Sequence, residues 1–288
     1  MKILFVGVFD TNRKSTNTSQ LLAFKRLGHD VTGYNYRQRA MMIGAENRDL
    51  HLWETISNSN FDLVVFSKCN GISNEVFKRA KSVTKTCLWF MDPLISYDEE
   101  MMSKTSLVSY FCCDKINVLH KALELNKNSF HVCEGYDEQV DKPHDIKKQH
   151  DVSFIGNLYG DRGELISKIN NDVTIFTSAY GSDHAKAVSS SRINLNFCTD
   201  AGASDRVYKI MAAGGFLLSN DWEGRKDHFT NGRDCVIFKD HNDLNEKISY
   251  YLKNPEMIKM ISDYGHQSVK VFSRASWASK IVELSYGI

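Results

Sequence analysis

The 288-residue chain has only three prolines, no apolar run near 18 residues and no excess of either charge. A membrane-spanning helix needs about 20 mostly apolar residues, so an ordinary span is excluded. Lys and Arg number 36 against 35 Asp and Glu, a formal net charge of +1. This balance argues against a protein that binds nucleic acid through bulk charge. The length favours two domains, and 42% hydrophobic residues is typical of a globular protein.

Several motifs for nucleotides, metals and hydrolysis are missing. The first strand-to-helix turn, Gly7–Asn12, lacks the second and third glycines of a dinucleotide fingerprint, which disfavours NAD or FAD there. The chain has no P-loop, no G-x-S-x-G, no H-E-x-x-H, and no D-x-D pair that would hold a metal. Its seven cysteines include no C-x-x-C, so reduced core thiols in a cytoplasmic protein are expected instead of disulfides or zinc.

Short apolar runs alternate with amphipathic segments along the chain. The runs predict strands at Ile3–Phe9, Val31–Tyr34, Leu63–Phe66, Thr86–Met91, Val108–Cys112, Phe130–Cys133, Val152–Ile155, Val173–Phe176, Ile193–Phe197, Phe216–Leu218 and Cys235–Phe238. The segments predict helices at Thr18–Leu27, Ser73–Val83, Lys115–Leu125, Arg162–Ile169, His184–Ser190, Asp205–Ala213, Asn242–Leu252, Pro255–Asp263 and Gln267–Leu284. This alternation predicts an α/β fold with parallel sheets wrapped by helices.

The polar stretch Lys142–Gln149, which contains Pro143, is a candidate linker. We therefore expect two Rossmann-like domains, residues 1–143 and 144–270, and a C-terminal helix at 271–288 that packs back towards the first domain. Ligands of such sheets bind at the carboxyl ends of the strands, and a cleft between two facing domains is the expected place for chemistry.

Two loops of the second half favour an anion. In Ser153–Arg162 (SFIGNLYGDR), a strand ends at Gly156 and Asn157, and Arg162 opens the next helix. Glycine lets backbone amides approach a ligand, while a helix N-terminus and an arginine fork suit a phosphate or diphosphate. A tight turn with a surface arginine is the plainer interpretation of this loop alone.

The second loop begins the segment Ala203–Asn220 (ASDRVYKIMAAGGFLLSN). Ser204 or Asp205 is expected to cap a helix, with Arg206 in its first turn and Lys209 three residues further, on a similar face. The small residues at the end of the helix allow close packing on the sheet. Two cations at the start of the helix are less easily explained by packing.

This segment resembles the donor-site helix of group 1 glycosyltransferases with the GT-B fold, closest to their spore-maturation (CgeB-like) branch. Further stretches resemble that branch in the same order: Asp151–Gly156, Arg192–Phe197, Gly232–Phe238, Asp243–Leu252 and, in the first half, Leu88–Pro93. The resemblance covers most of residues 151–285 and the first half only thinly. Where the family usually has an acidic residue, thought to hold the ribose hydroxyls, this chain has Lys209. A lysine cannot accept those hydrogen bonds, so either Asp205 or another group takes that role, or Lys209 touches phosphate.

The resemblance implies a hexosyl- or pentosyltransferase that moves a sugar from a nucleotide-diphosphate sugar, UDP-sugar above others, to an acceptor hydroxyl without a metal or other cofactor. The implied donor-binding residues are Gly156, Asn157, Arg162, Asp205, Arg206, Tyr208 and Lys209. Asp92 and Asp10, each after a predicted strand of the first domain, are candidates for the acceptor-side base. Both also suit a turn or a helix cap, and a transfer that retains configuration needs no such base.

The acceptor stays open: a glycan, a small molecule or a hydroxylated base in DNA. DNA would need a basic face on the first domain, for which the candidates are Arg37, Arg39, Arg48, Lys78, Arg79, Lys81 and Lys85. The polar loop Asp10–Ser19 either closes over the acceptor or is an ordinary solvated loop. Two alternatives to transfer remain, a GT-B hydrolase or epimerase of nucleotide sugars and a non-catalytic nucleotide-sugar-binding protein.

Overall fold

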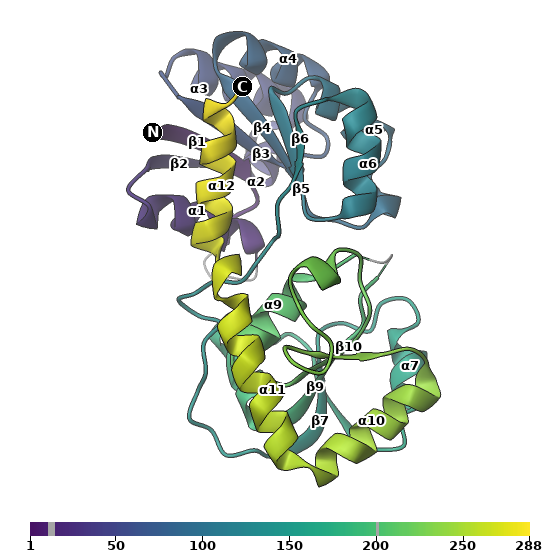
Figure 1. Ribbon diagram of the computed structural model, residues 1–288. Helices are drawn as coiled ribbons and strands as arrows, with labels where there is room; N and C mark the ends of the chain where they lie inside the picture. Colours follow the sequence, from purple (N-terminus) through teal and green to yellow (C-terminus); the bar gives the residue numbers. More distant parts are fainter. Residues whose placement is uncertain (11–14, 200–201) are drawn as a thin grey trace. The chain divides into compact units, whose positions relative to one another are not determined.

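The computed structural model describes residues 1–10, 15–199 and 202–288 (Figure 1). The chain divides into two units, which we call unit 1 (Met1–Glu134 with Arg274–Ile288) and unit 2 (Gly135–Ser273). Each unit contains one parallel sheet with helices between its strands. The predicted α/β fold with two Rossmann-like sheets is therefore confirmed. The domain bounds 1–143, 144–270 and 271–288 stay a prediction.

Unit 1 has a six-stranded sheet in the order β2-β1-β3-β4-β5-β6. Its strands are β1 (Lys2–Gly7), β2 (Asp30–Asn35), β3 (Leu63–Ser67), β4 (Lys85–Phe90), β5 (Tyr110–Cys113) and β6 (Ser129–His131). Its helices are α1 (Thr16–Arg26), α2 (Tyr36–Ile43), α3 (Ala45–Ser57), α4 (Asn74–Val83), α5 (Glu99–Ser106), α6 (Ile116–Leu125) and α12 (Arg274–Tyr286), with a 3₁₀ turn η1 (Leu94–Ser96). Because β3 to β5 are buried along almost their whole length, they appear in the sequence as unbroken apolar runs.

Alternate residues of these strands feed two separate cores. Phe5 and Val65 belong to the core that also contains Trp277 of α12. Val64 and Phe66 point to the opposite face, where α3 to α6 complete the second core. Figure 1 shows α12 beside α1, although the two helices are at opposite ends of the chain.

Unit 2 has a five-stranded sheet in the order β11-β10-β9-β7-β8. Its strands are β7 (His150–Ile155), β8 (Val173–Phe176), β9 (Ser191–Asn196), β10 (Leu217–Asn220) and β11 (Val236–Phe238). Its helices are α7 (Arg162–Ser167), α8 (Ser182–Ser190), α9 (Asp205–Ala212), α10 (His241–Lys253) and α11 (Pro255–Ser268), with 3₁₀ turns η2 (Arg225–Asp227) and η3 (Val269–Phe272). Since β7 pairs directly with β9, the loops that follow these two strands emerge side by side.

The small residues at the end of α9 serve packing, as the sequence predicts. A Cβ on Gly215 would lie 2.4 Å from Cγ1 of Val188 and 3.0 Å from the carbonyl oxygen of Ile210. Any larger residue would therefore force α9 away from α8 and from its own strand connection.

The prediction of one helix over Gln267–Leu284 is wrong. Helix α11 ends at Ser268, a 3₁₀ turn follows, and Ser273 is extended before α12 begins. The amide of Tyr136 donates to the carbonyl of Phe272, and Tyr136 and Ser273 form a parallel bridge. The carbonyl of Phe272 is thus bonded to another segment of the chain, so it cannot accept the hydrogen bond that a continuous helix would require.

All seven cysteines are free, and six are buried, as expected for core thiols. Burial raises the pKa of Cys235 to about 12, which keeps this thiol protonated and unreactive at neutral pH. No helix in the described part of the chain combines the length and the apolar character that crossing a bilayer requires.

Candidate functional site

Two arginines from different helices meet at the carboxyl ends of β7 and β9. Arg162 opens α7 and donates from Nη2 to Oγ1 of Thr199 (3.1 Å) and to the carbonyl of Phe197 (3.4 Å), both after β9. Its Nη1 donates to the carbonyl of Asn157 (3.3 Å), after β7. Arg162 therefore ties the two neighbouring loops together.

Arg206, the second residue of α9, reaches the same edge from the other side. Its Nη1 donates to the carbonyl of Ile155 (3.1 Å), the last residue of β7. Its guanidinium carbon lies 5.0 Å from the centre of the Phe154 ring, a cation–π contact. The head of Arg206 is thus held at the end of the strand by a carbonyl and an aromatic face.

The two guanidiniums repel each other, and the charge of Asp205 offsets this for Arg206 only in part. Among residues 1–10, 15–199 and 202–288, no carboxylate forms an ion pair with Arg162 or Arg206. Burial and then repulsion from Arg162 lower the pKa of Arg206 to about 10, so it stays charged at neutral pH. Two neighbouring cations, one of them deeply buried and offset only in part by Asp205, are stabilised by an anion that binds both.

Gly156 is required by the approach of Arg206. Its φ is +143°, and a Cβ there would lie 2.6 Å from Nη1 of Arg206. The next residue, Asn157, turns its side-chain amide to the hydroxyl of Tyr159 (3.2 Å) and contributes its carbonyl to Arg162. These two predicted site residues therefore shape the loop that positions the arginines.

The start of α9 differs from the expectation in one respect. Ser204 occupies the N-cap position, but its hydroxyl donates to Oδ1 of Asn196 (3.1 Å) and does not cap the helix. Asp205 does not cap either and instead forms an ion pair with Lys209, one turn further along the helix. Ser204 is therefore the N-cap residue, but the predicted hydrogen bond from its side chain to the helix is not formed, because its hydroxyl is bonded to Asn196.

Tyr208 lies on the inner side of α9. It is 4% exposed, and its ring is 5.4 Å from that of Phe272 and 6.3 Å from that of Phe229. Its role in donor binding stays a prediction.

His184 was not predicted as a site residue, because it has no metal-ligand spacing. It is buried in α8, and neither ring nitrogen has a hydrogen-bond partner in the described residues. Burial and then the charge of Lys209 lower its pKa to about 3, so the ring is neutral. Nothing in the local sequence marks this burial, which depends on the packing of α8 on α9.

In unit 1, Asp92 follows β4 and forms a 2.7 Å ion pair with Nζ of Lys68, which follows β3. Lys68 and Cys69 have φ values of 58° and 62°, a left-handed conformation that is strained for residues other than glycine. Such strain is frequent at functional sites. No glycine marks the position, so the sequence carries no signal of it.

Asp10 has a structural role in the turn after β1. Its carboxylate accepts a hydrogen bond from the amide of Ser15 (2.9 Å), and its own amide donates to the hydroxyl of Thr18 (3.1 Å). The predicted loop Asp10–Ser19 is described only in part, since residues 11–14 lie outside the described residues.

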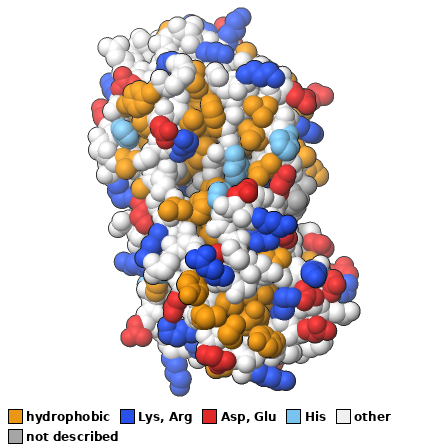
Figure 2. Space-filling model, viewed as in Figure 1, with side chains coloured by type: hydrophobic (Ala, Val, Ile, Leu, Met, Phe, Trp, Pro, Cys, Tyr) orange, Lys and Arg blue, Asp and Glu red, His pale blue; other side chains and the backbone are white. Residues whose placement is uncertain are grey.

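Two of the basic residues considered for a DNA-binding face are engaged within unit 1. Arg48 is 3% exposed and pairs with Asp49 at 2.6 Å, and Arg79 lies 4.1 Å from the centre of the Trp53 ring. On the face shown in Figure 2, Lys and Arg side chains are mixed with Asp and Glu. In the described parts of the chain, no three His, Cys, Asp or Glu residues are grouped closely enough to hold a metal ion.

Comparisons with known proteins bear on the fold and on the family of the second half of the chain. Residues 142–284 match the model of the family described as glycosyl transferase-like, whereas the curated proteins include no match. The structure is similar to that of Anabaena Alr3699/HepE in complex with UDP-glucose (TM-score 0.70, 10% identity, 100% of both chains).

Two further solved structures are similar over nearly the whole chain. One is a glycosyltransferase from Rickettsia africae (TM-score 0.68, 12% identity, 99% of this chain and 98% of that one). The other is sucrose-phosphate synthase from Thermosynechococcus elongatus (TM-score 0.70, 10% identity, 99% and 98%). Residues 142–284 therefore form a domain of the glycosyl transferase-like family, and the chain has the fold of GT-B glycosyltransferases.

Proposed function

We propose that the chain transfers a sugar from a UDP-sugar to an acceptor hydroxyl, and that Arg162 and Arg206 hold the donor's diphosphate. The observation that carries this proposal is the pair of guanidiniums, without an ion-pair partner in the described residues, at the ends of β7 and β9. Among the relatives, the HepE structures contain UDP and UDP-glucose, which supports uridine as the nucleotide. We also propose that the chain belongs to the spore-maturation (CgeB-like) branch of these glycosyltransferases.

In this reaction the bond between the anomeric carbon and the diphosphate oxygen breaks. Negative charge grows on the departing UDP, and the acceptor oxygen forms the new bond to the sugar. Donors fixed where charge develops stabilise the transition state, and each is worth about 3–4 kcal/mol. We assign this task to the two arginines and the amides at the start of α9, in place of a metal held by a D-x-D pair.

Asp205, which pairs with Lys209, is our candidate for the role of the acidic residue that the family usually has where this chain has Lys209. Both side chains are about one quarter exposed, with 27% for Asp205 and 24% for Lys209. A carboxylate can accept hydrogen bonds from two ribose hydroxyls, which an ammonium cannot. We therefore assign the ribose to Asp205, with Lys209 holding that carboxylate in position.

On the acceptor side we assign Asp92 as the base if the transfer inverts configuration. Its partner Lys68 holds the carboxylate at the carboxyl edge of the sheet. Asp10 remains the second candidate, although its carboxylate already serves the turn before α1.

A panel of UDP-, GDP- and ADP-sugars tests the proposal, with UDP release measured with and without added acceptors. The panel of acceptors includes glycans, small hydroxylated molecules and DNA containing hydroxymethylated bases. Release of UDP that depends on an acceptor supports transfer. Release without an acceptor would indicate a hydrolase or epimerase, and binding without release would indicate a binding protein. Failure of every nucleotide to protect the amides at the start of α9 from hydrogen exchange would refute the donor site.

A further inference from the structure

One buried amide side chain joins three segments of unit 2 near the arginine pair. Asn196, the last residue of β9, is fully buried. Its Nδ2 donates to Oγ of Ser219 on β10 (3.0 Å) and to Sγ of Cys198 (3.1 Å). Its Oδ1 accepts a hydrogen bond from the hydroxyl of Ser204 (3.1 Å), the residue before α9. Both donors and the oxygen of this amide therefore have partners, and a satisfied buried network of this kind is rigid.

The segment that follows β9 is fixed a second time. Asn220, the last residue of β10, accepts with Oδ1 from the amide of Cys198 (2.7 Å) and donates with Nδ2 to its carbonyl (3.0 Å). The carbonyl of Phe197 and the hydroxyl of Thr199 accept hydrogen bonds from Nη2 of Arg162. The two acceptors that orient this guanidinium thus lie on either side of a residue whose backbone and side chain are both held.

The same amide also fixes the point where α9 begins. Ser204 immediately precedes the helix, and Arg206 is its second residue. Nη1 of Arg206 donates to the carbonyl of Ile155 (3.1 Å), so a shift of the helix start would lengthen this hydrogen bond. The side chain of Asn196 is therefore linked to both guanidiniums, to one through the loop after β9 and to the other through the start of α9.

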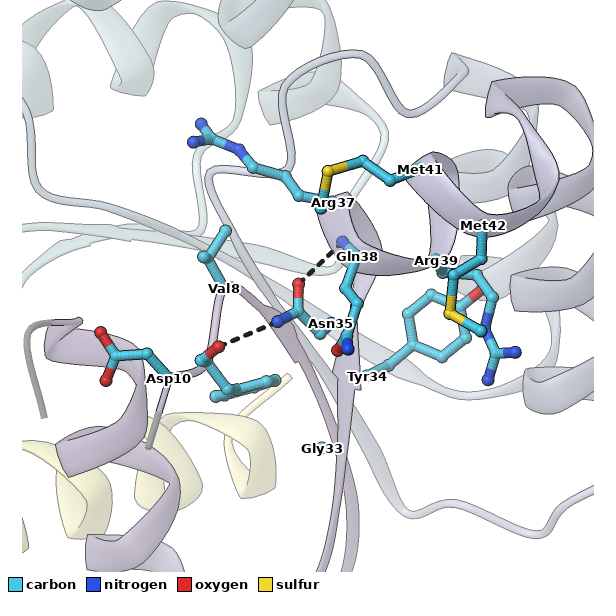
Figure 3. A pocket seen from close by; sticks show the side chains of 11 residues that line it. Val8, Asp10, Gly33, Tyr34, Asn35, Arg37, Gln38, Arg39, Met41 and Met42 are labelled. Carbon is cyan, nitrogen blue, oxygen red and sulfur yellow. Dashed lines mark hydrogen bonds between the residues drawn. The ribbon is translucent and has the colours of Figure 1, made fainter. Parts of the chain in front are cut away.

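The bond from Ser204 to Asn196 has a second consequence for α9. The residue before a helix often caps it: the Asn35 side chain accepts from the amide of Gln38 at the start of α2 and donates to the carbonyl of Phe9 (Figure 3). Ser204 does not cap α9 in this way, because its hydroxyl is turned to Asn196. The N-cap side chain therefore leaves the first-turn amides of α9 to an anion.

We propose that Asn196 is a positioning residue of the donor site. It holds the side chains of Arg162 and Arg206 at the same edge of the sheet, and it keeps Ser204 from capping the helix whose amides face the ligand. That the ligand is the diphosphate of a UDP-sugar rests on the proposed function, whereas the positioning of the two arginines does not.

The test measures UDP affinity by calorimetry and the Nε–Hε signals of the arginines by ¹⁵N NMR, both on the full chain. Ser204→Ala removes the bond to Asn196, so UDP affinity should fall about fivefold to tenfold and the Arg206 signal should move. Ser204→Thr retains the hydroxyl and should bind UDP as the wild type does. Asn196→Ala also releases Cys198, so it should move the signals of both arginines and lower UDP affinity by about tenfold or more.

Ser153→Ala is the matched control. Ser153 donates to Oδ1 of Asn194 (3.2 Å), a buried bond of the same kind in the same sheet, two residues before Asn196. The control should leave the arginine signals and UDP affinity unchanged, although it removes a buried hydrogen bond. An equal loss of affinity in Ser153→Ala, or no rescue by Ser204→Thr, would overturn the proposal, because a general loss of stability would then explain the effect.

The two measurements separate this proposal from the proposed function. If the wild type binds no UDP, the donor assignment is refuted, and the arginine signals of the free protein still decide the positioning role. If the wild type binds UDP and Ser204→Ala binds it equally well, only the role of Asn196 is refuted. Should Asn196→Ala fail to fold, Ser204→Ala and Ser204→Thr still give the decision.

Discussion

Replacing Arg206 by methionine separates a binding role from a structural one. Methionine has similar length but no charge, so Arg206→Met removes the cation and leaves the volume. If Arg206 stabilises the departing diphosphate, turnover of the UDP-sugar should fall by about 10²- to 10³-fold, the effect of one lost oxyanion donor. UDP should also bind more weakly, because charge-assisted hydrogen bonds to its phosphates are lost.

The same substitution should hardly change stability. The fall in the pKa of Arg206 from 12.5 to about 10 means that folding disfavours its charged form by about 3 kcal/mol. Both the folded and the unfolded chain carry the charge at pH 7, so the folded wild type bears this unfavourable free energy and the methionine variant does not. It loses a cation–π contact of about 1 kcal/mol and a charged hydrogen bond of about 2 kcal/mol. The sum is close to zero.

The assay combines urea unfolding, UDP binding by calorimetry and sugar turnover. Arg192→Met is the control in the same sheet, because Arg192 pairs with Asp151 at 3.0 Å and lies outside the arginine edge. A variant of Arg206 that retains turnover and UDP affinity would refute the assignment. A variant that loses several kcal/mol of stability would show that Arg206 serves the fold.

Three more predictions follow from the geometry. Gly156→Ala introduces a Cβ 2.6 Å from Nη1 of Arg206, so UDP affinity should fall about tenfold and stability by about 1–3 kcal/mol. His184 has a pKa of about 3 in the fold against 6.5 when unfolded, so its contribution is complete above pH 6.5 and is lost as the pH falls. By pH 5 this loss amounts to about 2 kcal/mol, and His184→Leu should abolish it, measured by urea unfolding with fluorine-labelled Trp222 in unit 2. Lys68→Gly relieves a left-handed φ of 58°, so thermal unfolding should show a gain of about 1 kcal/mol while transfer activity falls.

Each of these predictions has a contradicting outcome. Unchanged UDP affinity in Gly156→Ala would mean that UDP binding does not depend on the present position of the Arg206 guanidinium. A pH dependence that survives in His184→Leu would assign the acid sensitivity to other groups. Full activity in Lys68→Gly would show that the ion pair with Asp92 is not used in transfer.

The strands were predictable because burial on both faces leaves an unbroken apolar run. Val173–Phe176 has its predicted bounds, and Leu63–Ser67 differs by one residue. Helices α2 and α3 were not predicted. Their boundary is Gly44, with a φ of 81°, and exposed residues such as Met41 blur the apolar periodicity of α2. A pattern method depends on one buried face, which α2 largely lacks.

The candidate site was predictable in its parts and not in its assembly. The sequence indicates that Arg162 and Arg206 each open a helix after a strand. Their proximity depends on the pairing of β7 with β9, a contact between segments far apart in the chain. The Lys68–Asp92 pair likewise joins two loops, and the left-handed Lys68 is a strained choice that local propensity does not favour.

The position of Trp277 has a consequence for biosynthesis. Its ring lies 5.2 Å from that of Phe24, 5.4 Å from Trp89 and 6.3 Å from Phe5, all in the first third of the chain. While the ribosome is still translating unit 2, the nascent first sheet has no Trp277 to cover these rings. Unit 2 can complete its own core first, and the rings of the early segment then stay uncovered until α12 emerges.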